Sequence, residues 1–361
     1  PYVFIADAYW IVRLLVLALQ ICSVLTLTHH FLVIRCGMDG LTWVSVSCLL
    51  LMAEIQCAMS PQSAIFWYVG TTHYMLPVAM ALFAVVLGDR FLMLQDGTRG
   101  AMIRDYVLLL ILQTLLGGAS YQSALLVPLT LAVILLMKRA VAGRQKTDVS
   151  HAVFRRECAL LIPFIAELAG LIISAKAPGN KARGGENFGF SFAKAAETIL
   201  QCFAEAAQQA VNYLLHYTYA VIAVILIGTL VHAAMSAGRQ KGTYRHPLFF
   251  ILLMLCLNAS AHAPALYAAV DVSGGVGNTN FYVFLFTLCA VVVYLTGWAE
   301  EKRLEIPKPA IAKAALVLVI LLMCILGRHS LKATTDYVCY TYISSGQAAD
   351  YRMQTSQQYE L

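Results

Sequence analysis

The sequence predicts an all-α polytopic membrane protein, on the evidence of its composition, the length of its apolar runs and the placement of its charges. Of its 361 residues, 60% are hydrophobic and only 12% are charged. A soluble domain of this size would have too few polar side chains to cover its surface. Apolar runs of about 20 residues recur along the chain, and this length crosses the hydrocarbon core of a bilayer. We therefore expect about ten transmembrane helices.

The first six apolar runs precede the most polar part of the chain. They cover approximately 9–27, 41–58, 74–88, 106–116, 121–137 and 158–175. A Gly-Gly-Ala-Ser sequence separates the fourth run from the fifth, and glycine and serine favour tight turns. These six runs are expected to be consecutive membrane-spanning helices.

The next segment, 191–210, is rich in alanine but is not uniformly apolar. Its charged and amide side chains recur at helical spacing, at Lys194, Glu197, Gln201, Glu205 and Gln208. This pattern predicts an amphipathic helix lying at the membrane surface. Four further spans follow at approximately 211–235, 248–270, 281–299 and 310–327. We expect residues 1–327 to form a single transmembrane domain and residues 328–361 to form a tail on the outer side.

The basic residues divide the loops into two sets. Most loop lysines and arginines follow the first, third, fifth, seventh and ninth runs, and the largest group lies between Lys138 and Arg156. Loops rich in these residues stay in the cytoplasm. The remaining loops, 59–73, 117–121, 176–190 and 271–280, are therefore expected outside. Pro1 would also lie outside, so we expect one more helix upstream of it.

The outer stretch from Lys176 to Gly189 is glycine-rich and basic. Lys181 and Arg183 lie there close to Asn180. Glycine-rich backbone can present N–H groups to an anion, and the arginine fork suits phosphate. We expect Asn180, Lys181 and Arg183 to bind a phosphate group. The alternative is a solvated loop that only links two helices.

The loops 59–73 and 117–121 bring aromatic and amide groups to the same side. Aromatic residues often anchor a protein at the membrane surface, but rings and hydroxyl groups also suit carbohydrate. The start of a helix favours anions because its N–H groups are free. The candidate sugar- or acceptor-binding residues are Trp67, Tyr68, Tyr74, Tyr121 and Gln122. The loop 271–280 contains small polar residues and is expected to be a flexible linker.

Two carboxylates lie inside apolar runs, Glu54 near the outer end of the second and Glu167 deeper in the sixth. Charged residues at the centre of a membrane cost about 2.5–3.5 kcal/mol on insertion scales and often mark functional sites. Either carboxylate could instead bond a neighbouring helix. The same structural role is expected for His216, His232 and His262, in preference to haem ligation. The ten cysteines show no ligand spacing, so no metal site is predicted.

Three short segments resemble a group of bacterial multi-pass membrane proteins of unknown function that are similar to GT-C glycosyltransferases. They are Phe66-Trp-Tyr-Val-Gly-Thr-Thr-His-Tyr-Met-Leu-Pro77, Gly117-Gly-Ala-Ser-Tyr-Gln-Ser123 and Ala177-Pro-Gly-Asn-Lys-Ala-Arg183. The polar run from Tyr351 to Leu361 is a weaker similarity. Together the segments cover about thirty residues, but their order and membrane spacing fit most of the chain.

The resemblance implies an enzyme of the bacterial inner membrane whose active site faces outward. Such enzymes transfer a sugar from a polyprenyl-phosphate donor to a glycan, glycolipid or protein of the cell envelope. The catalytic carboxylate of the family follows the first transmembrane helix, where only Asp7 is available in this chain. Sugar transfer needs a group that accepts the proton of the acceptor, for which the candidates are Asp7, Glu54 and His73. No divalent metal or other cofactor is assigned.

Two other functions compete with sugar transfer. A transporter or flippase of a lipid-linked glycan would need polar groups through both halves of the membrane. A non-catalytic subunit of a membrane-protein complex would need only surfaces for its partners. Nucleic acid is not an expected partner, because the net charge of +6 comes from loop residues that report topology.

Overall fold

A computed structural model describes residues 9–93, 99–142, 151–184, 189, 191–238, 243–303 and 309–360. The first half contains α2 (Tyr9–Thr28), η1 (His29–Arg35), α3 (Gly40–Gln56), η2 (Gln62–Phe66), α4 (Tyr68–Gly70), η3 (Thr71–Met75), α5 (Leu76–Met93), α6 (Arg99–Gly117), α7 (Tyr121–Ala142), α8 (His151–Ala159) and α9 (Leu161–Ala175). The second half contains α10 (Pro178–Gly184), α11 (Phe192–His216), α12 (Thr218–Ser236), α13 (Pro247–Ser260), α14 (Ala263–Ala268), α15 (Gly274–Glu301), α16 (Pro309–Leu326), η5 (Gly327–Ala333), α17 (Thr335–Ser344) and α18 (Gln347–Glu360). No strand occurs in these described ranges.

Within these ranges, seven helices are long and apolar enough to cross a membrane, or eight if α16 and η5 form one bent span. Two further apolar helices, α3 and α13, are shorter. The expected all-helical architecture is confirmed. The predicted total of ten is reached only if the bent pair and both short helices also cross.

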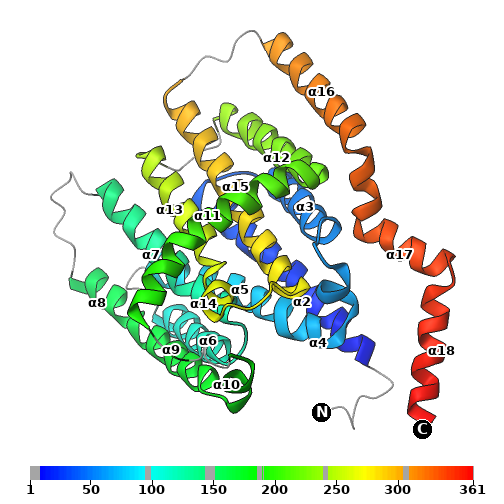
Figure 1. Cartoon of the computed structure of the whole chain (residues 1–361). Coiled ribbons are helices and arrows are strands. Elements are labelled where there is room, and N and C mark those ends of the chain that lie inside the picture. Colours follow the sequence, from blue (N-terminus) through cyan, green and yellow to red (C-terminus); the bar gives the residue numbers. More distant parts are fainter. Residues whose placement is uncertain are drawn as a thin grey trace.

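Helix α5 lies at the centre of the bundle and contacts α2, α6 and α7 (Figure 1). One apolar core fills the space between α3, α12 and α15, and includes Leu50, Ile227 and Phe281. A second lies between α5, α6 and α7, and includes Leu109 and Val127. These two largest cores are connected through α5, because its Val78 belongs to the first and its Ala81 to the second.

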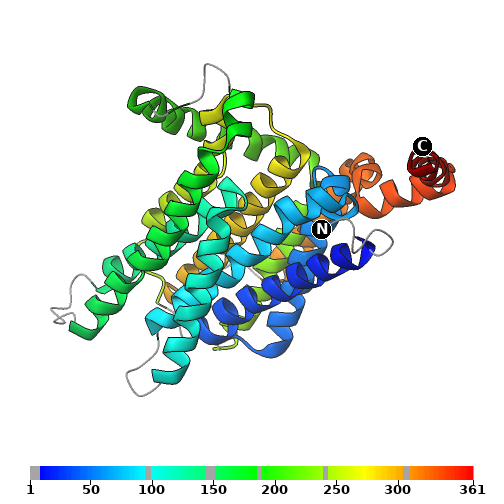
Figure 2. The same cartoon turned by 90° about the horizontal axis from the view of Figure 1, so that it is seen from below.

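The C-terminal elements lie beside the bundle, as both views show (Figure 1, Figure 2). Helix α16 contacts α12, and α18 packs mainly against α17. Thr335 Oγ1 donates to the carbonyl of Ile55 at 2.6 Å, which ties α17 to the end of α3. Helix α17 therefore begins at the end of the bundle that the sequence predicts to be outside.

Four predicted segments differ from the structure. The surface helix continues as α11 to His216, and the following span begins at Thr218 rather than near 211. The break occurs at Tyr217, whose backbone leaves the helical region (φ −105°, ψ 57°). Residues 178–184 form the short helix α10 instead of an open glycine-rich loop.

The third correction concerns the loop 271–280, which was expected to be flexible. Helix α15 begins at Gly274, and Ser273 caps it by accepting a hydrogen bond from the backbone N–H of Val276. The small polar residues that resemble a linker therefore form the first turns of the longest described helix. The loop 59–73 is likewise mostly helical, since it contains η2, α4 and the start of η3.

Glycines allow α6 and α9 to approach each other closely. A Cβ atom on Gly117 would overlap the backbone carbonyl of Glu167, and one on Gly170 would lie 3.0 Å from the carbonyl carbon of Gly117. Small residues permit such close backbone contact between helices in a membrane. The adjacent Gly118 has more space, because its nearest neighbour would be the Leu115 carbonyl at 3.8 Å.

We predict that Gly117→Ala lowers the free energy of unfolding by about 1–3 kcal/mol, because the added methyl group overpacks the contact between α6 and α9. Gly118→Ala is the matched control and should change stability little. Thermal unfolding of the purified protein in detergent measures both. Equal melting temperatures for the two variants would contradict the assigned contact.

Candidate functional site

The first two turns of α15 contact the loop that precedes η2. Asn278 donates to the carbonyl of Ser60 and accepts from its N–H, both at 2.9 Å. The hydroxyl groups of Tyr74 and Ser273 are 3.2 Å apart. Gly275 makes room for Tyr74, because a Cβ atom at this position would overlap the tyrosine ring. The loops 59–73 and 271–280 therefore meet directly.

Asn280 joins the same helix to α7 and α14. Gln122 Nε2 donates to Asn280 Oδ1 at 2.6 Å and lies 2.9 Å from the Ala261 carbonyl oxygen. Asn280 Nδ2 donates to His262 Nδ1 at 3.3 Å. Gln122, His262 and Asn280 are all buried. Residues two positions apart point about 200° apart on an α-helix, so Asn278 and Asn280 can bind opposite neighbours.

A third set of hydrogen bonds connects α7 with α9 and α10. Asn180 Nδ2 donates to the Tyr121 hydroxyl group at 2.8 Å and to the Ser174 carbonyl at 2.7 Å. The Tyr121 and Ser174 hydroxyl groups are 3.1 Å apart. Tyr121 and Gln122 are consecutive, so this set continues into the contact with Asn280. Because the basic loops predict that this end lies outside, we call the whole network the outer polar assembly: Ser60, Tyr74, Tyr121, Gln122, Ser174, Asn180, His262, Ser273, Asn278 and Asn280.

The predicted aromatic residues Trp67 and Tyr68 lie between η2 and η3, which both contact α15. Trp67 has half of its surface exposed, His73 is exposed and Tyr68 is partly exposed. The rings of His73 and Tyr74 meet edge to face, with centroids 4.8 Å apart. Arg13 donates to the Phe66 carbonyl oxygen, which ties this segment to α2.

The candidate bases lie in different places. Glu54 is completely buried, and Gln20 Nε2 donates to its carboxylate. It does not face the outer surface. His73 is exposed there, whereas Asp7 lies outside the described residues. Glu167 is also buried and accepts a hydrogen bond from Gln113 at 3.1 Å.

The predicted phosphate-binding residues are only partly defined. Asn180 is held by Tyr121 and Ser174, and it is partly exposed. The structure describes the backbone of Lys181 and Arg183 as part of α10, but it does not describe their side chains. The structure therefore places the backbone of the basic segment next to the start of α7.

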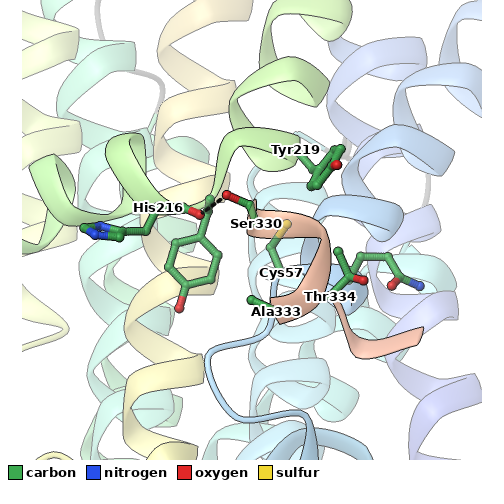
Figure 3. A pocket seen from close by; sticks show the side chains of 8 residues that line it. Cys57, His216, Tyr219, Ser330, Ala333 and Thr334 are labelled. Atoms are coloured by element: carbon green, nitrogen blue, oxygen red, sulfur yellow. Dashed lines mark hydrogen bonds between the residues drawn. The ribbon is translucent and has the colours of Figure 1, made fainter. Parts of the chain in front are cut away.

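A small pocket lies between the end of α3, the corner from α11 to α12, and η5 (Figure 3). The hydroxyl group of Ser330 donates to the carbonyl of His216 at 2.9 Å across it. Its lining also includes Gln56, Cys57, Tyr217, Tyr219, Ala333 and Thr334. The cavity is about 10 Å³, which admits no more than one water molecule. A sugar or a lipid headgroup does not fit there.

The histidines inside apolar runs mostly contact other parts of the chain. His262 bonds Asn280, and His232 lies 2.6 Å from the Glu300 carboxylate, so both contact α15. His216 Nδ1 lies 2.9 Å from the Asn212 carbonyl oxygen of its own helix. In the ranges that the structure describes, no group of three histidine, cysteine or acidic side chains could hold a metal ion.

Comparisons with protein families, with curated proteins and with solved structures return no match. The class is defined by the structure itself: an all-helical protein whose apolar helices are long enough to cross a membrane. Its candidate site is the outer polar assembly together with the adjacent exposed aromatic residues.

Burial lowers the pKa of His262, because the charged imidazole would lose its hydration, although Glu205 acts in the opposite direction. The ring must also be neutral at Nδ1 in order to accept the hydrogen bond that Asn280 donates there. In the unfolded chain the ring would have its ordinary pKa, about 6.5. The unfolded state therefore binds more protons below that pH.

We predict that acidification from pH 7.5 to 5.5 destabilises the protein, with full stability above about pH 6.5 and progressive loss as the pH falls toward the lowered pKa of His262. The variant His262→Gln retains an acceptor but does not titrate, so its melting temperature should fall less over this interval. Melting curves at several pH values measure the difference. Equal losses in both proteins would show that His262 is not responsible.

Proposed function

We propose that this protein is a GT-C-like membrane glycosyltransferase that moves a sugar from a polyprenyl-phosphate donor to a glycan or glycolipid acceptor at the outer face of a bacterial inner membrane. The observation that carries the proposal is the outer polar assembly. All three segments of the family resemblance contribute to it, through Tyr74, Tyr121 and Asn180. Residues that share a site are expected to meet in this way although they are distant in sequence.

The donor phosphate would bind at α10. The hydrogen bonds of Asn180 hold this short helix against α7 and α9, and the helix carries Lys181 and Arg183. A guanidinium group can bind two phosphate oxygens at once. Negative charge grows on the phosphate as the sugar departs, so cationic donors held in place would stabilise the transition state.

The sugar and the acceptor would bind on the aromatic side. Trp67 and Tyr68 offer ring faces to the sugar. The acceptor hydroxyl oxygen attacks the anomeric carbon, the bond from that carbon to the phosphate oxygen breaks, and its electron pair stays on the phosphate. The proton of the acceptor passes to a base. His73 is the exposed candidate among the described residues, and its ring is positioned by Tyr74.

This proposal uses the orientation inferred from the basic loops. If the seven long helices, the short helices α3 and α13, and the bent pair of α16 and η5 all cross the membrane, both α4 and α10 would lie outside. Helix α11 has one strongly apolar side, which includes Ile199, Leu200 and Leu215. It would lie on the outer surface and shield the site from the surrounding lipid.

The competing function is transport of a lipid-linked glycan. One observation favours it, because buried polar groups occur well away from the outer polar assembly. They include the Gln113–Glu167 pair and the His30–Asp89 pair. A transporter would move the intact lipid-linked sugar across the bilayer, whereas a transferase would separate the sugar from the lipid. An assay with a labelled donor lipid distinguishes these products.

We predict that polyprenyl phosphate copurifies with the protein after gentle extraction from its native membrane, and that Arg183→Ala reduces this bound fraction at least tenfold. Loss of a phosphate-binding arginine removes charge-assisted hydrogen bonds that contribute about 1.5–3 kcal/mol each. Native mass spectrometry measures the bound lipid. Lys176→Ala is the matched control, because Lys176 is an exposed cation at the end of α9.

The same preparations should transfer labelled sugar from the donor lipid, and the Arg183→Ala variant should not. Equal lipid binding and transfer by wild type, Arg183→Ala and Lys176→Ala would refute the phosphate role of Arg183. Movement of the intact labelled lipid without release of its sugar would favour the transporter.

A further inference from the structure

Helix α2 carries buried polar residues along much of its length. Gln20 and Ser23 are completely buried, and Thr28 and His30 are at most 6% exposed. An α-helix rises 1.5 Å per residue, so Gln20 and His30 are separated by about 15 Å along the axis. Polar groups are costly inside a membrane, and their presence over half its thickness requires a reason.

The outer end of this series is a cluster around Glu54. Gln20 Nε2 donates to one carboxylate oxygen, while Glu54 Oε2, Gln20 Oε1 and the Tyr282 hydroxyl group are buried and have no partner. Tyr282 lies close enough to Glu54 to experience its charge. Tyr282 is also one helical turn from Asn278, so the cluster lies directly below the outer polar assembly.

Hydroxyl groups continue the series between α2 and α3. Ser23 Oγ donates to the carbonyl of Gln20 at 2.7 Å. Thr28 Oγ1 and Ser47 Oγ are 2.7 Å apart, and both side chains are buried. Trp43 Nε1 donates to Thr28 Oγ1 at 3.2 Å. A hydroxyl group can donate and accept at the same time, which is the property that passing a proton requires.

The other end reaches the surface through an ion pair. His30 Nε2 lies 2.7 Å from Asp89 Oδ2, and Arg35 Nε donates to the same oxygen at 2.8 Å. The other imidazole nitrogen, Nδ1, is buried and without a partner. The Arg35 side chain is 29% exposed. His30 and Arg35 lie in the π-helical segment η1, and such segments frequently occur at functional sites.

We propose that these residues form a proton pathway through the bundle, which we call the polar seam: Gln20, Ser23, Thr28, His30, Ser47, Glu54 and Asp89. A proton enters from the outer polar assembly past Tyr282 and is taken up by the buried Glu54. Hydroxyl groups and bridging water pass it along α2, and His30 accepts it at Nδ1. His30 then gives its Nε2 proton to Asp89 Oδ2, Asp89 passes that proton to solvent beside the partly exposed Arg35, and the ring returns to its starting tautomer before the next transfer. The reverse direction uses the same steps, and the gradient decides which occurs.

The charged groups around the inner end are consistent with this role. Asp89 faces His30 from α5, Arg35 faces it from η1, and Lys138 of α7 lies within electrostatic range of both Asp89 and Arg35. Asp89 therefore faces the imidazole ring on one side and the two cations on the other. The proposal rests on this geometry alone and is independent of sugar transfer.

The test is proton flux into liposomes that contain the purified full chain and the pH-sensitive dye pyranine, driven by a potassium gradient with valinomycin. We expect wild type to acidify the lumen several-fold faster than protein-free liposomes. Glu54→Gln should return the rate to the protein-free level, because glutamine cannot take up a proton. Glu167→Gln is the matched control, since Glu167 is equally buried and bonded to a glutamine, but lies outside the polar seam.

Thr28→Val provides a second variant of nearly unchanged shape, and it should also slow the flux because it removes one hydroxyl group. Elution profile and melting temperature establish that each variant is folded. Wild-type flux equal to that of empty liposomes would overturn the proposal. So would full flux in folded Glu54→Gln and Thr28→Val, or an equal loss in Glu167→Gln.

Discussion

Two buried asparagines on α15 hold the outer end of this protein together. An amide inside a low-dielectric bundle must find hydrogen-bond partners, because leaving it without them costs more than the bonds themselves contribute. Asn278 satisfies this requirement with the backbone of Ser60, and Asn280 satisfies it with Gln122 and His262. Since the two side chains leave the helix on different sides, one turn of α15 positions the segment that follows α3 and the starts of α7 and α14.

The remaining features of the candidate site depend on this arrangement. The position of α7 fixes the position of Tyr121, and Tyr121 in turn holds Asn180 by a hydrogen bond. The basic helix α10 is therefore held at the same end as the aromatic residues. Tyr282 lies one turn further into the bundle, close enough to the buried Glu54 to experience its charge. Sugar transfer would use the outer surface of the assembly, and proton movement would use the interior below it.

The sequence was sufficient for the fold class and for the side-by-side placement of several loops, but not for the role of 271–280. Apolar length predicts helices reliably, because crossing a membrane requires it. The run Gly274–Asn280 has poor helix propensity, so its helix depends on the Ser273 cap and on tertiary contacts that no local pattern reveals. For the same reason, sequence reasoning missed Asn278 and Asn280. Gln20 was missed because its role is to donate a hydrogen bond to Glu54, which is 34 positions away in the sequence.

The central claim is that Gln122 and Asn280 stabilise the outer end as a bonded pair. A double-mutant cycle with Gln122→Leu, Asn280→Leu and the combined variant tests it most directly, with unfolding measured in detergent. Hydrogen bonds between membrane helices contribute about 0.6 kcal/mol on average and up to about 1.7 kcal/mol. We expect a coupling energy in the upper part of this range, since the pair is buried. Strictly additive losses would show that the two residues act independently, and would contradict the account.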